Sequence, residues 1–235
     1  MKGLLVRIAA DQSKAGGHWN GPVDSKTGHF AYVAIPECSP SHPNLNKPYA
    51  GVISALAGLS SPLPAHLAHQ NMHLDPDFKH LTYGDGRERA NQIRSKLKTG
   101  DLIAFYGGLR DMHRSPRLVY AIIGIYVVAD IVSATSVPRS RWDENAHTRR
   151  RFPGADDIVV RASPGVSGRL ERCVPIGEYR ERAYRVLPSL LTAWGGISVN
   201  NGYLQRSARL PEFTDANKFY EWFMAQGVPL IPRNN

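Results

Sequence analysis

Two carboxylates, an imidazole and a proline lie together in the stretch His73-Leu74-Asp75-Pro76-Asp77-Phe78. The ring of Pro76 restricts the backbone on both sides of it, so the neighbouring aspartates cannot easily fold away. Carboxylates held in this way can serve acid–base chemistry, bind a cation, or cap the next secondary-structure element. The stretch is therefore the first candidate catalytic site, with Asp75 and Asp77 as carboxylates and His73 as a proton donor.

Two further carboxylates could complete such a site. Asp11 lies in a glycine-rich loop after the first predicted strand, and Glu37 follows Pro36 at the end of the second. Asp11 is the better second carboxylate, although an aspartate in this position often only closes a turn. Glu37 is equally a candidate salt-bridge partner.

A metal site is the second option for this part of the chain. His66, His69 and His73 recur at three- and four-residue spacing in residues 64–72, which read as a helix. That spacing could place three imidazoles on one face. No HExxH pattern and no nearby cysteine supports a ligand set, so we expect no metal, and the histidines are polar surface residues. No Walker sequence and no GxGxxG occurs either, so we expect no cofactor.

The composition is typical of a chain that buries a core and works in water. The 235 residues are 42% hydrophobic and 21% charged, which favours a single elaborated domain over residues 1–235. The longest apolar run, residues 118–128, is too short to span a bilayer, and the N-terminus does not read as a signal peptide. Only Cys38 and Cys173 are present, which favours a reducing, cytoplasmic location.

The charge of the chain indicates a nucleic-acid partner. The formal net charge is +9, from 21 arginines and 8 lysines against 20 acidic residues. Guanidinium groups bind phosphate in a bidentate manner and stack on bases, so a nucleic acid is the expected partner, although arginine content can also follow genomic base composition. The predicted phosphate-binding residues are Arg87, Arg89, Arg114, Arg117, Arg149, Arg150 and Arg151. An ordinary solvated basic surface is the alternative.

The predicted elements do not alternate as βαβ units. Strands are expected at residues 3–9, 29–35, 102–106, 118–131 and 170–176, and helices at 87–97 and 216–226. Residues 184–194 fit either a helix or a strand. This order favours an α+β fold with a mixed, partly closed β-sheet or a PUA-like barrel, surrounded by helices. Residues 1–132 would form its core, and residues 133–235 a basic loop with a completing strand and helix.

Five segments in this order carry a resemblance to a known family. They are Asp11 with Ser13 and Gly16-Gly17, then Ile35-Pro36-Glu37, His73 to Asp77, Gly100-Asp101-Leu102 leading to Phe105-Tyr106-Gly107, and Tyr120 to Val128. Together they resemble the nucleotide modification associated domain of the third type over roughly residues 1–130. The last two segments also look like PUA-like and EVE-like domains, which bind modified bases. Lys14 and His18-Trp19-Asn20 depart from the family pattern.

The resemblance implies contact with modified or hypermodified DNA bases, often in phage-related or defence settings. Some defence proteins of this size resemble DNA glycosylases that remove phage-modified cytosines, such as glucosylated hydroxymethylcytosine, and leave abasic sites. A non-catalytic reader of modified bases is the alternative, and an enzyme that decorates a nucleotide is the third possibility.

A glycosylase needs a flipped base, a counter-charge for the sugar and a positioned water. We expect Asp75 to supply the last two, with Asp11 opposite it. The base would be held by aromatic and amide side chains, for which the candidates are Trp19, Asn20, Phe30, Tyr32 and Tyr106. No lysine lies in an evidently apolar setting, so a water-using reaction is favoured over a Schiff base.

Overall fold

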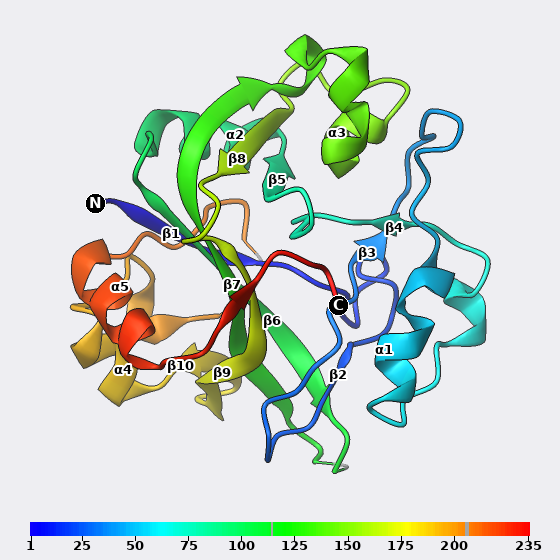
Figure 1. The fold of residues 1–235 in the computed structure, drawn as a ribbon. Coiled ribbons are helices and arrows are strands. Elements are labelled where there is room, and N and C mark those ends of the chain that lie inside the picture. The colour runs from blue at the N-terminus through cyan, green and yellow to red at the C-terminus, as the bar shows by residue number, and fades with distance from the viewer. Residues whose placement is uncertain (114, 205–206) are drawn as a thin grey trace.

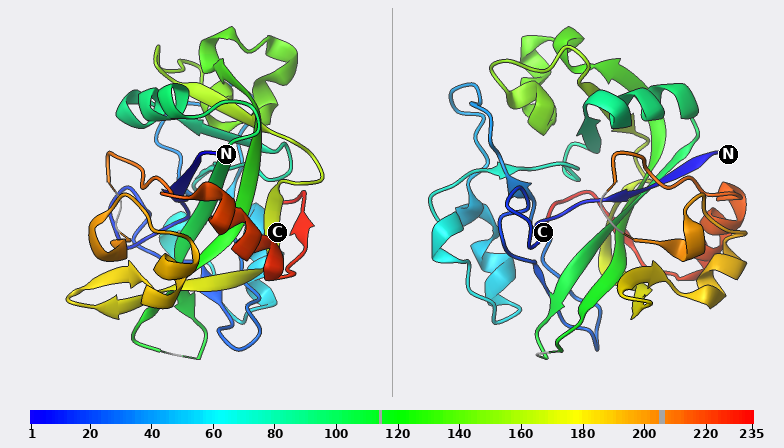
Figure 2. Two further views of the ribbon diagram at one scale, coloured as in Figure 1. Left: turned by 90° about the vertical axis from the view of Figure 1, so that its left-hand side faces the viewer. Right: turned by 180° about the vertical axis from the view of Figure 1, so that it is seen from behind.

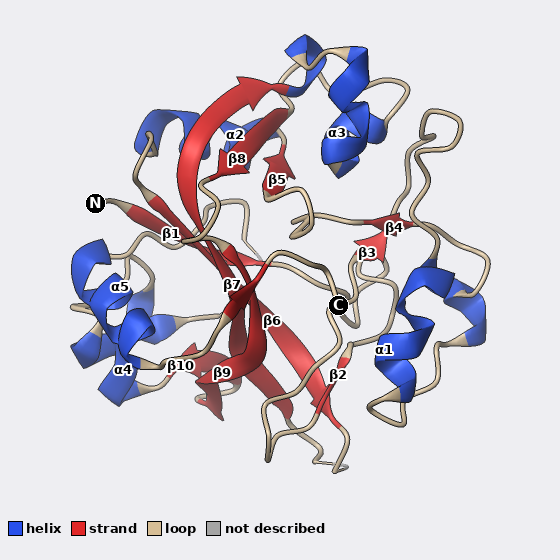
Figure 3. Ribbon diagram, in the orientation of Figure 1, coloured by secondary structure: helices blue, strands red, loops and turns tan. Residues whose placement is uncertain are grey.

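A nine-stranded mixed sheet forms the centre of the computed structural model, which describes residues 1–113, 115–204 and 207–235 (Figures 1 and 3). Its strands are β1 (Gly3–Arg7), β2 (Pro22–Val23), β5 (Thr82–Asp85), β6 (Leu102–Asp111), β7 (Leu118–Ser133), β8 (Ile158–Ala162), β9 (Gly168–Arg180), β10 (Ala183–Val186) and β11 (Leu230–Ile231). A separate two-stranded sheet pairs β3 (Ile35–Pro36) with β4 (Met72–His73).

The hairpin of β6 and β7 organises the large sheet, as the two apolar runs predict. β1 and β2 add to β6 in parallel, and all other pairings are antiparallel. The long β7 curves (Figure 1), so its first half pairs with β6 and β9 and its last residues pair with β8, which carries β5. The α+β prediction with a mixed sheet is confirmed. The strands follow the order β1, β6, β7, β8, β5, and in the described ranges the two end strands, β1 and β5, do not pair with each other. The barrel alternative therefore does not form.

Alternation along β6 builds two hydrophobic cores, one on each face of the sheet. Ile103 and Phe105 point into one core, and Leu102 and Ala104 point into the other. The first core is closed by the loops that follow β1 and by the segment that holds α1. Trp194 and the helices near the C-terminus close the second (Figure 2).

The helices are short and peripheral. They are α1 (Ile53–Ala57), α2 (Arg87–Lys96), α3 (Ala146–Arg149), α4 (Pro188–Ala193) and α5 (Ala216–Ala225), with 3₁₀ turns at Tyr49–Val52, Ala65–Leu67, Ala134–Ser136, Arg139–Glu144 and Asn200–Gly202. The predicted helices at 87–97 and 216–226 are confirmed, and the Asp215 side chain caps α5 by accepting from the Lys218 amide at 3.1 Å. None of these described helices is long and apolar enough to cross a membrane.

Three expected elements differ in the structure. Residues 29–35 form only a bridge between Phe30 and Val23 before β3, because residues 30–34 are buried on all sides and their apolar pattern marks core. Residues 64–72 contain one 3₁₀ turn and then extend into β4. His69 is exposed and His66 contacts the Gly17 carbonyl, so the predicted row of imidazoles does not form. Residues 184–194 contain both β10 and α4.

Candidate functional site

A polar cavity of about 230 Å³ opens where the chain leaves β4, beside β5 and α3. The antiparallel pairing of β5 with β8 carries α3 to this place, because α3 precedes β8 in the chain and packs on β5. The cavity is lined by Arg7, Ile8, Ala9, Ile35, His73, Asp75, Tyr83, Gly84, Asp85, Arg89 and His147. It therefore contains part of the predicted site together with residues from the end of β1 and the loop after it, β3, β5, α2 and α3.

Asp75 is held in the cavity wall with its side chain 4% exposed. The Gly84 amide donates to both carboxylate oxygens, at 2.8 and 3.0 Å, and the Asn145 side chain donates to Oδ1 at 3.0 Å. Burial raises the pKa of Asp75 to about 7, while His147 and these two donors act to lower it. Gly84 has to be glycine for this approach, since a Cβ there would lie 2.4 Å from the His147 ring.

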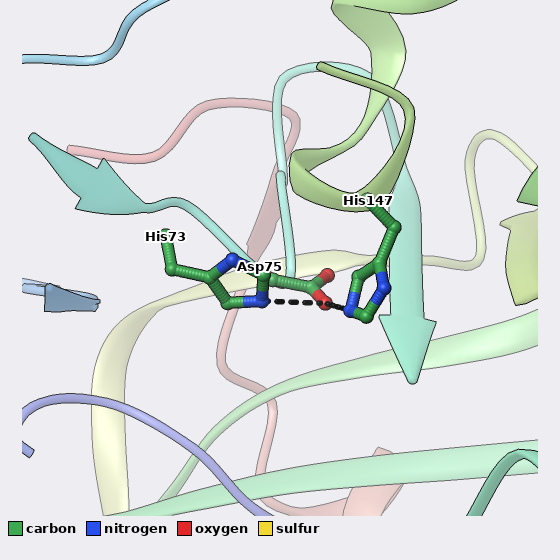
Figure 4. A group of neighbouring side chains, drawn as sticks. All are labelled: His73, Asp75 and His147. Carbon is green, nitrogen blue, oxygen red and sulfur yellow. Dashed lines mark ion pairs between the residues drawn. The ribbon is translucent and has the colours of Figure 1, made fainter. Parts of the chain in front are cut away.

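Two imidazoles face the free side of Asp75 from opposite segments (Figure 4). The Nε2 atoms of His73 and His147 lie 3.8 and 3.7 Å from Oδ2 of Asp75. The two rings are 5.1 Å apart and almost perpendicular, at 71°. Two nitrogens and one oxygen thus converge on one point at the cavity.

Each of these rings is oriented from behind by its own carboxylate. Nδ1 of His73 lies 2.6 Å from Glu37, and Nδ1 of His147 lies 2.7 Å from Asp157. An ionised carboxylate can only accept, so Nδ1 donates in both pairs, and in the neutral form of each ring the lone pair is on Nε2. Arg150 lies between the two acids, 3.2 Å from Glu37 and 3.7 Å from Asp157.

The ionised state of both acids follows from their partners. Burial acts to raise the pKa of Glu37, but the hydrogen bond and charge of His73 and the charge of Arg150 lower it to about 2. The pKa of Asp157 is likewise lowered, against burial, by His147 and by the Gly154 amide. Each histidine therefore has an ionised carboxylate at its Nδ1 before any ligand binds.

Cationic groups lie on the remaining wall of the cavity. Arg89 pairs with Asp85 at 3.2 Å, and the Tyr83 hydroxyl donates to the same carboxylate. Arg7, at the end of β1, lies 3.7 Å from Asp11 and 5.3 Å from the ring of Tyr120. Two guanidinium groups beside a carboxylate suit a ligand that carries phosphate next to its reacting bond.

The predicted catalytic residues do not all share this cavity. His73 and Asp75 line it, and Glu37 touches it through His73. Asp11 lines a second cavity, of about 330 Å³, which has Arg7 in common with the first. Asp77 is buried on the other side of the Pro76 turn, where it pairs with Arg149. Burial acts to raise the pKa of Asp77, but His80, Arg149 and Asn234 hold it well below the usual range.

The predicted base-binding residues do not reach the cavity around Asp75. Phe30, Tyr32 and Tyr106 are at least 93% buried in the cores, and the Tyr32 hydroxyl donates to the Pro76 carbonyl at 3.1 Å. The Asn20 amide donates to the Gly108 carbonyl at 2.7 Å, and Trp19 packs against the first core. None of the five lines the Asp75 cavity.

The predicted phosphate-binding arginines divide into three sets. Arg87, Arg117 and Arg151 are exposed, while Arg89 reaches the cavity. Arg149 is buried and forms an ion pair with Asp77, and Arg150 forms ion pairs with Glu37 and Asp157. Both arginines therefore bind acidic residues of the protein itself. The remaining prediction, Arg114, lies outside the described residues.

Sequence reasoning missed His147, Asn145, Asp157 and Arg7. Residues 133–166 are rich in arginine and are predicted to form a basic loop, which gives His147 no fixed position. One signal was present, because Asn145 and Thr148 have the spacing of a capping box, which the structure forms at the start of α3. A helix there would have directed a search toward its single histidine.

Comparison with protein families agrees with the resemblance seen in the sequence. The model of the family described as nucleotide modification associated domain 3 matches residues 2–218. The match extends well beyond residue 130 and includes α3 and β8, hence His147 and Asp157 as well as Asp75. No curated protein and no solved structure is similar enough to match the chain.

Proposed function

The chain belongs to the nucleotide modification associated domain 3 family, and from that premise we propose that it hydrolyses the N-glycosidic bond of a modified cytosine in DNA. The family gives the chain a role related to nucleotide modification, and the cavity around Asp75 is the proposed reaction site. The observation that carries the proposal is the convergence of Asp75, His73 and His147 on one point beside two arginines.

Base excision places three demands on a site. The nucleotide must leave the stack, at a cost of a few kcal/mol, positive charge on the sugar must be balanced, and water must meet the anomeric carbon. Asp75 meets the second demand as the buried carboxylate of the cavity. Asp75 and the two Nε2 atoms together meet the third, because they form a polar pocket in which a water molecule finds hydrogen-bonding partners.

The remaining features fit a nucleotide in DNA. Arg7 and Arg89 are placed to bind the phosphates that flank an extruded nucleotide. A volume of about 230 Å³ is below the roughly 300–1,000 Å³ of pockets that enclose drug-sized ligands, so the cavity suits one base or sugar. The formal charge of +9 favours approach to the DNA backbone.

The test compares duplexes of one sequence that carry cytosine, hydroxymethylcytosine or glucosylated hydroxymethylcytosine at a single position. After incubation with the protein, hot alkali breaks the strand at every abasic site. We expect breaks at a modified cytosine and none at plain cytosine. Tight, modification-dependent binding without breaks and without release of free base would identify the chain as a reader of modified bases.

A further inference from the structure

Three atoms that could bind a metal face one another in the wall of the cavity. They are Oδ2 of Asp75 and the Nε2 atoms of His73 and His147, all within 4.8 Å of one another. The separations of 3.8 and 3.7 Å from Asp75 are longer than a hydrogen bond. Both rings use Nδ1 on Glu37 and Asp157, so in their neutral form they present the lone pairs of Nε2 toward Asp75 (Figure 4). Such a group attracts a cation.

We propose that His73, Asp75 and His147 bind one divalent transition-metal ion, and that this ion carries the water that attacks the sugar. The second half of this inference rests on the proposed glycosidic hydrolysis, and the first half does not. Two imidazoles and one carboxylate are a ligand set that zinc and ferrous iron both accept. Hard cations such as Mg²⁺ prefer oxygen ligands and are not expected here.

The two distances from Asp75 suit such an ion. Nitrogen and oxygen ligands lie about 2.0–2.2 Å from zinc, so two ligands of one ion are at most about 4.2 Å apart. Both distances from Asp75 to a histidine are below this limit. His73 and Asp75 come from one extended segment in which residues two apart point the same way, and α3 supplies His147 from the other side.

The surroundings of the three ligands provide a second, independent reason. A metal-bound histidine almost always donates its other ring proton to a carboxylate, which fixes its tautomer and direction. Here both histidines have such a carboxylate, at 2.6 Å for Glu37 and 2.7 Å for Asp157. Arg150 contacts both of these acids, so the two outer pairs are joined into one support. The Asp75 carboxylate is itself fixed by Gly84 and Asn145.

Three protein ligands leave at least one coordination position open toward the cavity, which is the pattern of catalytic zinc sites. Bound water there loses a proton near neutral pH, at a pKa of about 7. The resulting hydroxide forms a bond to C1′ of the sugar while the C1′–N bond breaks and its electron pair leaves with the base. The base then takes up one proton, so the reaction consumes one water and needs no oxidant or reductant.

Metal binding is tested directly on the full chain after treatment with a chelator. Titration calorimetry and metal analysis with Zn²⁺ should give one ion per chain, and Mg²⁺ should give no binding. His147→Ala and His73→Ala should each lose at least about 100-fold in zinc affinity, and the exposed His69→Ala should equal wild type. Glu37→Gln and Asp157→Asn, which leave all three ligands in place, should lose about 10- to 100-fold. Co²⁺ bound in place of zinc should show the visible absorption of a low-coordinate nitrogen and oxygen site.

The inference fails if wild-type protein binds no stoichiometric zinc, or if both histidine variants, folded by circular dichroism, bind it as wild type does. The two proposals fail separately. Zinc binding without base excision would leave the metal site standing and remove glycosidic hydrolysis. Excision at full rate by metal-free protein would support hydrolysis and contradict the role of the ion in carrying the attacking water.

Discussion

Nε2 of His147 lies 3.7 Å from the carboxylate of Asp75, although one residue belongs to α3 and the other follows β4. The contact exists because β5 pairs with β8, and because Thr82, the first residue of β5, forms an isolated bridge with Asp77 and so turns the chain back near Asp75. Asn145 joins the two residues, since its side chain donates to Asp75 and accepts from the His147 amide at 2.9 Å. The position of His147 relative to Asp75 therefore depends on how α3 packs on β5.

Asn145→Ala tests whether the packing of α3 on β5 positions the site. The substitution removes a helix cap, worth about 1 kcal/mol, and a buried hydrogen bond to a carboxylate, worth roughly 1.5–3 kcal/mol. We expect urea denaturation to show a loss of about 2–4 kcal/mol, together with a fall in excision at temperatures where the variant is folded. Asp215→Ala removes the cap of α5, a helix that packs on the second core and does not line the cavity. It should lower stability by about 1 kcal/mol and leave excision unchanged; equal excision by both variants would separate α3 from the site.

Gly84→Ala tests how closely β5 approaches α3. The added Cβ would lie 2.4 Å from the His147 ring and 2.6 Å from the Asn145 side chain, so the helix must shift. Overpacking costs about 1–3 kcal/mol, and a displacement of about 1 Å in a site can cost on the order of 100-fold in rate. We expect a loss of that size in single-turnover excision. Gly51→Ala is the matched control, because its Cβ would meet nothing within 4 Å; unchanged excision by Gly84→Ala would contradict the geometry of the site.

Arg149 and Arg151 are expected to behave in opposite ways although they are near neighbours. Arg149 is 3% exposed and pairs with the buried Asp77, so Arg149→Ala removes the guanidinium partner of a buried carboxylate and should cost about 3–5 kcal/mol. Arg151 is exposed beside Phe152, which is itself 81% exposed. Arg151→Ala should leave stability within about 0.5 kcal/mol of wild type.

The salt dependence of DNA binding should also differ between the Arg149 and Arg151 variants. For Arg151→Ala, the slope of log binding constant against log salt should fall by about 1, as for the loss of one phosphate contact. Arg149→Ala, measured where it is folded, should keep the wild-type slope. An unchanged slope for Arg151→Ala, measured by fluorescence anisotropy over several salt concentrations, would remove it from the DNA-binding surface.

The sequence predicted the elements that a short local pattern specifies. The apolar runs of β6 and β7, the amphipathic period of α2 and the Asp215 cap of α5 each specify an element without reference to the rest of the chain. Residues 29–35 show the limit of such reasoning, because an alternating apolar segment buried on every side needs no ladder partner.

Only part of the candidate site could be predicted from the sequence, for a related reason. His73 and Asp75 lie in one short stretch, so their spacing alone indicates a common direction. His147 and Asp157 join them only through the pairing of β5 with β8, and no local pattern encodes that register. The distribution of arginines also misleads, since buried ion pairs and phosphate contacts use the same residue type.

The most direct test of the central claim is the single-turnover rate of excision at one modified cytosine by wild type, Asp75→Asn and Asp130→Asn. Asp75 carries the reaction in this account, so its asparagine variant should be slower by about 10²–10⁴-fold while still binding the DNA. Asp130 is an exposed aspartate on β7, and its variant should match wild type. Excision by Asp75→Asn at the wild-type rate would contradict the assignment of this cavity as the reaction site.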